Sequence, residues 1–342
     1  MGIAICFMKT FLTCNVYAIN GLRILNSFKT ATWPGVESQS VDSIDLLEFR
    51  KQKEIDWRLH EGDEEDFTNL RSAFIAKSLY AALRLSGLYQ RGFRNATSPC
   101  LTQVKMPFLS IPDGLVGLRI LLLSDLHLSR KYPEFATNIT KLLTGVEADL
   151  CLIAGDYRFG HYGTVDHIYP QLDCILSAFK APLGVYGVLG NHDVSSMIPT
   201  LQALGINILY NTGFPVSVGG ETVWLAGCDD PHRFKTDHLV AALADAPDNA
   251  FKILLIHSPD RIEEAHNLGV QLYLCGHTHG GQIRIPRYGA VRLNAHCHTR
   301  FAYRQWHMDK MLGYTSPGLG TTDIPIRFSC PPEAQLITLA RK

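Results

Sequence analysis

Hydrophobic and polar residues follow two different patterns on either side of residue 111. Over residues 67–91, apolar side chains recur with the period of an α-helix, whereas from residue 111 short apolar runs alternate with helix-patterned stretches and with Gly, Pro and Asn. The second pattern is typical of an α/β core. Five of its apolar runs are predicted to be strands, at residues 118–123, 150–154, 184–189, 251–256 and 271–275.

The 67–91 segment is predicted to be an amphipathic helix with a basic border. Its apolar side consists of Phe67, Leu70, Phe74, Ala81, Leu85 and Leu88, and the basic residues on its flanks are Arg71, Lys77, Arg84 and Arg91. Such a helix suits an anionic membrane surface, where apolar residues enter the acyl boundary and basic residues meet the headgroups. It also suits a helix packed on the rest of the protein, with the stems of its basic residues covering apolar surface. Both interpretations stay open.

Charge is distributed unevenly along the N-terminal part of the chain. Residues 37–66 contain eleven acidic and four basic residues, a net charge of −7, whereas residues 67–105 contain six basic residues and no acidic one. We therefore predict a poorly ordered acidic extension over residues 1–66, a basic amphipathic helix and linker over 67–110, and an α/β domain over 111–342. Over the whole chain, Lys plus Arg equals Asp plus Glu at 32 each, so a nucleic-acid partner is not expected.

The composition is that of a globular protein. The 342 residues are 46% hydrophobic and 19% charged, which excludes a disordered chain and a polytopic membrane protein. Lys9 and Asn15 interrupt the apolar start of the chain, so neither a signal peptide nor a transmembrane helix is predicted there. The nine cysteines are scattered without a CxxC motif, which predicts reduced thiols. A cytoplasmic protein is expected, in peripheral contact with the inner face of the membrane if the 67–91 helix binds lipid.

A polar cluster directly follows each of the five predicted strands. In chain order the clusters are Asp125-Leu-His127, Gly155-Asp156, Gly190-Asn191-His192-Asp193, His257 and Gly276-His277-Thr278-His279. Of the fourteen histidines in the chain, thirteen lie from His127 onward. Loops at the carboxyl ends of strands meet in one crevice in open α/β sheets, so the five clusters are expected to converge in space.

The chemistry of these clusters suits two metal ions. Two aspartates, one asparagine and four histidines provide oxygen and nitrogen ligands without a thiolate, which favours Mn, Fe or Zn. On an extended strand end, alternate residues point the same way, so Asp125 and His127 can bind one ion together, and His277 and His279 repeat the arrangement. A carboxylate such as Asp156 can bridge two ions about 3.5 to 4 Å apart. The glycines that precede three of the clusters allow sharp turns beside the metals.

Taken in this order, the pieces DxH, GD, GNHD, H and GHxH resemble the calcineurin-like metallophosphoesterase superfamily, over residues 115–342. The resemblance implies an α/β fold, a four-layer α-β-β-α sandwich with two mixed sheets, preceded by a helical and partly disordered extension. It also implies an enzyme, a metal-dependent phosphoric ester hydrolase, which holds two divalent ions. Among Mn, Fe and Zn, manganese is the metal that we expect the site to bind.

The resemblance gives each polar residue of the clusters a role. The ligands implied for one ion are Asp125, His127 and His279, and those implied for the other are Asn191, His257 and His277. Asp156 is implied to bridge the two ions, and the nucleophile is implied to be a hydroxide between them. His192 is implied to be catalytic, donating a proton to the leaving oxygen or neutralising charge in the transition state. Asp193 is implied to fix the tautomer of His192.

A finer pattern resembles the bacterial membrane-linked branch that includes UDP-2,3-diacylglucosamine pyrophosphatase-like enzymes. It consists of residues 227–231, 276–283 and 316–332. The leading interpretation is therefore a phosphodiesterase or pyrophosphatase acting on a lipid-linked substrate such as UDP-2,3-diacylglucosamine. Three arginines near the site loops are candidates for contacts with substrate phosphate, namely Arg130, Arg158 and Arg284. Arg158 and the acidic extension depart from the pattern of this branch, which affects the substrate and not the metal site.

Two other functions remain as alternatives. A soluble phosphodiesterase or phosphatase acting on nucleotides, cyclic nucleotides or phosphoproteins would use the same metal site, and the 67–91 helix would then only pack on the domain. A non-catalytic scaffold is expected to have lost metal ligands, whereas here the ligand set and His192 are complete. The sequence does not indicate an oligomeric state.

Overall fold

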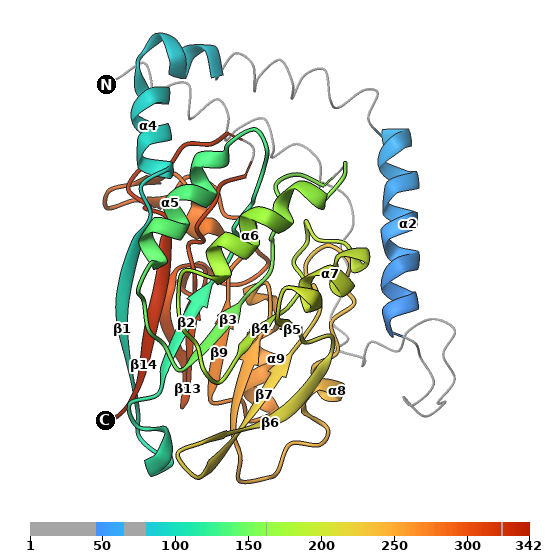
Figure 1. Ribbon diagram of the computed structural model, residues 1–342, viewed down its shortest axis with the longest axis vertical. Helices are drawn as coiled ribbons and strands as arrows, with labels where there is room; N and C mark the ends of the chain where they lie inside the picture. The colour runs from blue at the N-terminus through green and yellow to red at the C-terminus, as the bar shows by residue number, and fades with distance from the viewer. Residues whose placement is uncertain (1–45, 65–79, 162, 323) are drawn as a thin grey trace, which may run out of the picture. The chain divides into compact units, whose positions relative to one another are not determined.

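The computed structural model describes residues 46–64, 80–161, 163–322 and 324–342 (Figure 1). These residues belong to one compact unit, Asp45–Lys342. The start of the chain, for which no signal peptide or transmembrane helix is predicted, lies outside the described residues, and so does the first part of the predicted 67–91 helix.

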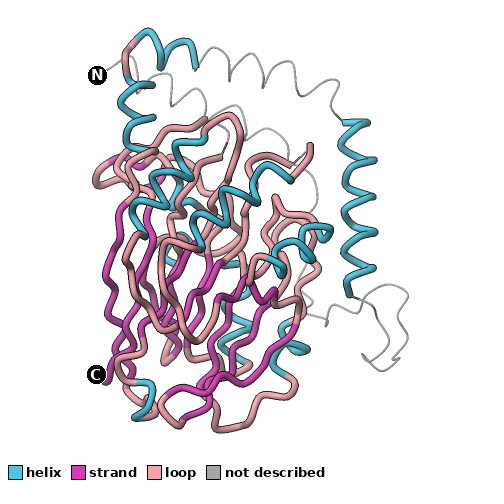
Figure 2. The backbone as a smooth tube through the Cα atoms, in the orientation of Figure 1, coloured by secondary structure: helices cyan, strands magenta, loops and turns pink. Residues whose placement is uncertain are grey.

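Two six-stranded mixed sheets form the centre of this unit (Figures 1 and 2). The first has the strand order β1 (Cys100–Phe108), β14 (Glu333–Arg341), β2 (Arg119–Leu123), β3 (Leu150–Ile153), β4 (Val185–Gly187) and β5 (Ile206–Ile208). The second has the order β12 (Arg304–Met308), β13 (Met311–Thr315), β9 (Leu272–Cys275), β8 (Phe251–Leu255), β7 (Glu221–Gly227) and β6 (Thr212–Val218). A separate two-stranded sheet pairs β10 (Arg284–Ile285) with β11 (Gly289–Ala290).

The two large sheets pack face to face, and helices cover their outer faces. One buried cluster contains Ile120 and Leu152 of the first sheet together with Ile253 and Leu274 of the second. The outer face of the first sheet packs against α5 (Pro133–Leu143), α6 (Tyr169–Leu176) and α7 (Ile198–Ala203). The outer face of the second packs against α8 (Leu239–Leu243) and α9 (Ile262–Asn267). The predicted four-layer α-β-β-α sandwich with two mixed sheets is confirmed.

All five predicted strands are present, but they are divided between the two sheets. β2, β3 and β4 run parallel in the first sheet, and β8 and β9 run parallel in the second. Both faces of β2, β3, β8 and β9 are mostly buried, which explains their nearly continuous apolar runs. The polar clusters therefore come from the carboxyl ends of strands in two sheets that face each other, whereas the argument for their convergence came from a single open sheet.

The N-terminal part of the described chain differs from the predicted boundaries. Residues 46–64 form helix α2 (Leu46–Glu64), so the prediction of a poorly ordered extension does not hold there. The predicted helix to residue 91 is interrupted at Gly87, which has a φ of 73°, and a second helix, α4 (Leu88–Ala96), follows. β1 pairs with β14 across more than two hundred residues, so the predicted domain start at residue 111 is too late. Local periodicity cannot reveal a pairing of this range.

Two further predictions concern cysteines and membrane spans. The seven cysteines within the described residues are free, as predicted, and four of them are buried, namely Cys151, Cys228, Cys275 and Cys330. In the part of the chain that the structure describes, no helix has the length and apolar character needed to cross a bilayer.

Candidate metal centre

The five polar clusters meet between the two sheets. Asp125 and His127 follow β2, Asp156 follows β3, and Asn191 lies in the loop after β4. From the second sheet, His257 follows β8, and His277 and His279 follow β9. Each of these seven side chains belongs to a residue that is at most 6% exposed. The structure therefore brings every predicted metal ligand to one buried location.

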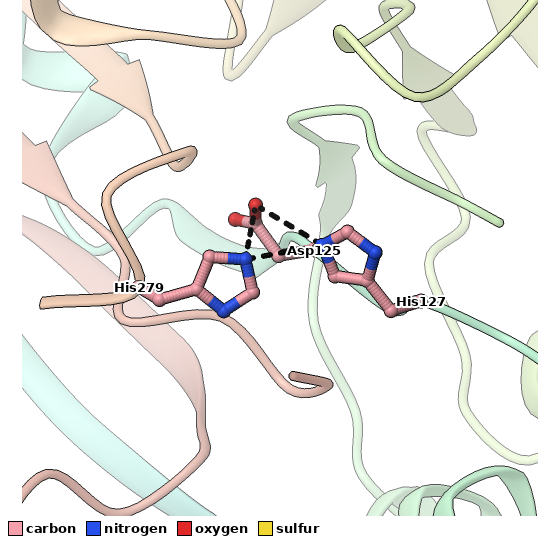
Figure 3. Close-up of side chains that lie close together, drawn as sticks. All are labelled: Asp125, His127 and His279. Atoms are coloured by element: carbon pink, nitrogen blue, oxygen red, sulfur yellow. Dashed lines mark hydrogen bonds and ion pairs between the residues drawn. The ribbon is translucent and has the colours of Figure 1, made fainter. Parts of the chain in front are cut away.

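One group of three ligands faces a common point (Figure 3). The Nε2 atom of His279 lies 3.2 Å from Oδ1 of Asp125 and 3.0 Å from Nε2 of His127. Oδ1 of Asp125 and Nε2 of His127 are 4.0 Å apart. An oxygen and two nitrogens that converge at these distances can hold one cation.

A second group lies beside the first, and Asp156 stands between them. Oδ1 of Asn191 is 2.9 Å from Nε2 of His257 and 2.8 Å from Nδ1 of His277. Oδ2 of Asp156 is 3.4 Å from Nε2 of His257 and 3.5 Å from Nε2 of His127. One carboxylate oxygen thus lies within reach of a histidine from each group, which is the placement expected of a bridging ligand.

Backbone carbonyl groups orient the ligand histidines. Nδ1 of His127 lies 3.1 Å from the carbonyl oxygen of Arg158, and Nδ1 of His257 lies 2.7 Å from that of Ala154. Since a carbonyl oxygen can only accept, we assign the proton of each neutral ring to Nδ1 and a lone pair to Nε2. These lone pairs face the Asp125, Asp156 and Asn191 oxygens, which are also acceptors. A cation at the centre satisfies all of them, so the residues present fit a metal.

The electrostatics of the centre favour positive charge. Burial lowers the pKa of His127 to about 4, so its ring is neutral at pH 7 and suited to be a ligand. Burial also lowers the pKa of His257, but the negative charge of the Asp156 carboxylate outweighs it and raises this pKa to about 10, so without a cation the ring carries a second proton on Nε2, and a bound metal would replace that proton. The buried carboxylates of Asp125 and Asp156 thus create a strongly negative site, which divalent cations neutralise.

The backbone at the ligands is strained. Five of the seven have a positive φ, namely Asp125 (51°), His127 (43°), Asp156 (55°), His277 (69°) and His279 (49°). Left-handed backbone is uncommon outside glycine, and it persists where the surrounding structure requires it. The prediction that Asp125 and His127 share one side of an extended strand is therefore wrong in its geometry, because β2 ends at Leu123 and tight turns aim both side chains at the metal site.

Two of the glycines that precede the clusters are needed for close approach. A Cβ atom on Gly276 would lie 1.8 Å from Oγ of Ser124 and 2.3 Å from Oδ2 of Asp125. A Cβ atom on Gly190 would lie 2.2 Å from Oδ1 of Asp156. The metal-site loops can reach this proximity only without a side chain at these positions.

His192 lies at the edge of the centre, and a residue other than Asp193 orients it. Nε2 of His192 is 3.9 Å from Oδ2 of Asp156, and its Nδ1 is 3.1 Å from the carbonyl oxygen of Gly160. The Asp193 carboxylate instead accepts from three backbone N–H groups, those of Asp156, Tyr157 and Gly190. The prediction that Asp193 fixes the His192 tautomer is therefore corrected, because Gly160 holds the Nδ1 proton and Asp193 ties two site loops together.

The three arginines predicted to contact substrate lie in different environments. Arg130 is exposed. Arg158 is 3% exposed, and its Nε donates to the carbonyl oxygen of Gly160. Arg284 donates to the carbonyl oxygen of Gly280 at 2.8 Å. Arg158 thus supports the loops that orient His127 and His192, while contact of any of the three with substrate remains a prediction.

Three residues of the site were not predicted from the sequence. The ring of His161 stacks on that of His192 with 3.7 Å between the centroids, and Nη2 of Arg233 lies 3.0 Å from Nε2 of His161. Arg327 is fully buried, donates to the carbonyl oxygen of Gly320, and has Nη2 3.3 Å from Nδ1 of His279. Arg327 belongs to the 316–332 part of the sequence pattern and Arg233 lies two residues after its 227–231 part, whereas His161 lies in a loop without a motif.

Comparison with known proteins places this site in a family. The sequence profile of the calcineurin-like phosphoesterases matches residues 118–281. The chain is 30% identical over 240 residues to the uncharacterised metallophosphoesterase YkuE of Bacillus subtilis, covering 67% of this chain and 81% of that protein. It is 29% identical over 246 residues to the phosphodiesterase YaeI of Escherichia coli, covering 66% and 84%. It is 30% identical over 271 residues to a transmembrane protein with metallophosphoesterase domain from Bos taurus, covering 73% and 59%.

The chain belongs to the calcineurin-like metallophosphoesterase family. It is accordingly a metal-dependent phosphoester hydrolase. All seven predicted metal ligands lie within the matched segment, whereas α2, β1 and β14 lie outside it.

Proposed function

We propose that the protein is a two-metal phosphodiesterase or pyrophosphatase that acts on a lipid-linked substrate, with Mn²⁺ as its first choice of ion. The observation that carries the two-metal part is the position of Asp156, whose Oδ2 lies 3.5 Å from Nε2 of His127 and 3.4 Å from Nε2 of His257. The E. coli relative is named a phosphodiesterase, which supports a diester rather than a monoester substrate.

Seven residues of the chain have proposed roles as metal ligands in the hydrolysis reaction. When bound, the two ions polarise the scissile phosphate and bring the pKa of water towards neutrality. Asp125, His127 and His279 would hold one ion, Asn191, His257 and His277 would hold the other, and Asp156 would join the two groups. The loops around them are buried and hydrogen-bonded to one another, which favours a rigid ligand geometry.

His192 is the proposed proton donor to the leaving oxygen. Its Nδ1 proton is held by the Gly160 carbonyl, so Nε2 is the atom that faces the centre. Burial lowers the pKa of His192 well below its ordinary value. An anionic phosphate beside Nε2 favours the protonated ring, so we infer that His192 takes up its second proton when substrate binds and passes it to the leaving group. Asp193 contributes by holding the loop in place.

A lipid-linked substrate such as UDP-2,3-diacylglucosamine is proposed from the sequence pattern and from the surface near α4. Leu85 is 91% exposed, and Arg84, Arg91 and Arg94 of the same stretch of chain are also exposed. An exposed leucine among arginines suits peripheral contact with an anionic membrane, such as the inner face of the cell membrane. The bovine relative is named a transmembrane protein, which is consistent with a family that works at membranes. Arg130, Arg158 and Arg284 are the proposed contacts for the remaining phosphate oxygens.

A substrate panel tests this proposal. Enzyme reconstituted with Mn²⁺ is assayed against UDP-2,3-diacylglucosamine in vesicles, a cyclic nucleotide and bis-p-nitrophenyl phosphate, with Asp156→Asn as the inactive control. We expect kcat/KM to be highest for the lipid. A higher value for the cyclic nucleotide, with no effect of vesicles, would favour the soluble phosphodiesterase instead.

A further inference from the structure

Helix α2 (Leu46–Glu64; Figure 1) carries two charged side chains that are buried against the loops of the metal centre. Arg50 is fully buried, and Glu54 is 7% exposed. Arginine and glutamate are almost never buried to this extent unless they are paired. Since α2 lies outside the segment matched by the family profile, these two residues are not part of the family's metal-binding motifs.

Arg50 contacts the loop that carries a metal ligand and the proposed proton donor. Its Nη2 donates to the carbonyl oxygen of Asp193 at 2.8 Å and lies 3.4 Å from that of Gly190. These two carbonyl groups flank Asn191 and His192. Arg50 therefore holds both ends of the short segment that carries His192, while the amide of Asn191 is also held by His257 and His277.

The same guanidinium connects this loop to a second one, over residues 228–234. Nη1 of Arg50 donates to Oδ1 of Asp229 at 2.7 Å, and the guanidinium carbon lies 3.8 Å from the centre of the Phe234 ring. Asp229 is fully buried, and the charge of Arg50 opposes the rise in its pKa that burial causes. Neither charge is left unpaired, so the contact is a complete ion pair rather than a chance surface encounter.

Glu54 lies one helical turn after Arg50 on α2 and also contacts the 190–195 loop. Its Oε1 accepts from Nε of Arg50 at 2.8 Å and from the backbone N–H of Ser195 at 2.7 Å, and its Oε2 accepts from Oγ of Ser195 at 3.0 Å. Glu54 thus holds the residue at which the His192 loop ends. Together the two side chains tie α2 to residues 190–195 at four backbone or side-chain positions.

We propose that Arg50 and Glu54 are positioning residues, which hold the 190–195 loop so that Nε2 of His192 faces the scissile phosphate. They act through His192 and contact neither substrate nor metal. This inference rests on the proposed role of His192 as proton donor.

The test is a double-mutant cycle between Arg50→Met and His192→Ala, with an alkyl phosphodiester as substrate because its poor leaving group needs the proton. In the wild-type background, we expect Arg50→Met to lower kcat about tenfold or more, with KM within about twofold and two metals retained. In the His192→Ala background, we expect Arg50→Met to change kcat by less than about twofold. Lys51→Met removes the same charge from the neighbouring, exposed position and is expected to leave kcat unchanged.

Two results would overturn the proposal. Folded Arg50→Met with wild-type kcat would show that the loop keeps its place without α2, and an equal loss in both backgrounds would show that Arg50 does not act through His192. Should Arg50→Met fail to fold, Glu54→Gln decides by the same cycle, since it keeps the shape of the side chain but loses its charge and one of its two acceptor oxygens. His192→Ala alone tests the proposed function, because wild-type activity in that variant refutes the proton donor and leaves the metal assignment intact.

Discussion

The Nε2 atoms of His127 and His279 lie 3.0 Å apart, although 152 residues separate the two histidines in the chain. His127 follows a strand of the first sheet, and His279 follows a strand of the second. The metal centre therefore joins the two halves of the sandwich. The two ring nitrogens lie close enough together to bind the same cation.

Replacing His192 separates proton donation from metal binding. His192→Ala is expected to fold and keep its metals, because the seven ligands and their carbonyl partners are untouched, while kcat falls about 10²- to 10⁴-fold. The loss should be smaller for p-nitrophenyl esters than for alkyl esters, since a good leaving group needs little protonation. Steady-state kinetics on both substrates measure this. An equal loss for both would mean that His192 stabilises charge or binds substrate.

Asp193 is expected to matter for stability rather than for proton transfer. Its buried carboxylate accepts from three backbone N–H groups, and Asp193→Asn replaces one acceptor oxygen by a donor. We expect about 2 to 4 kcal/mol lower stability in urea unfolding, since buried donors lose their partner. Asp173→Asn, on the exposed side of α6, serves as the control.

The kinetic behaviour of Asp193→Asn distinguishes the two roles. The folded Asp193→Asn variant should keep the wild-type difference in kcat between substrates with good and with poor leaving groups. A variant of unchanged stability that loses this difference, as His192→Ala does, would restore Asp193 as the residue that orients His192.

The exposed basic residues around α4 test the membrane part of the account. Replacing Arg84, Arg91 and Arg94 together by Gln removes about 1 kcal/mol each near an anionic surface, so vesicle binding should weaken roughly a hundredfold. Hydrolysis of bis-p-nitrophenyl phosphate should not change. Cosedimentation with anionic vesicles at low and high salt measures binding, and a triple Gln variant at exposed Lys141, Lys180 and Lys310 is the control. Failure of the wild-type protein to bind anionic vesicles at low salt would refute membrane contact.

The convergence of the polar clusters could be predicted from sequence because each cluster follows an apolar strand, although tight turns rather than extended strand ends aim their side chains. The residues that support them could not. Arg50 and Glu54 belong to a segment whose many charges resemble a solvated surface, and only tertiary contacts reveal that these two face inward. The resemblance implied Asp193 as the partner of His192, but adjacent residues in a tight loop diverge, and the carbonyl group of Gly160 occupies the position instead.

Metal content of wild-type protein and Asp156→Asn tests the central claim most directly. After removal of bound metal and titration with Mn²⁺, wild-type protein should bind two ions per chain, and Asp156→Asn should bind both more weakly, because the carboxylate oxygen lies 3.5 Å and 3.4 Å from a histidine of each group. Asp166→Asn, an exposed aspartate in the same half of the protein, should bind like wild type. Saturation of wild-type protein at one ion, or two ions held by Asp156→Asn with wild-type affinity, would contradict a centre bridged by Asp156.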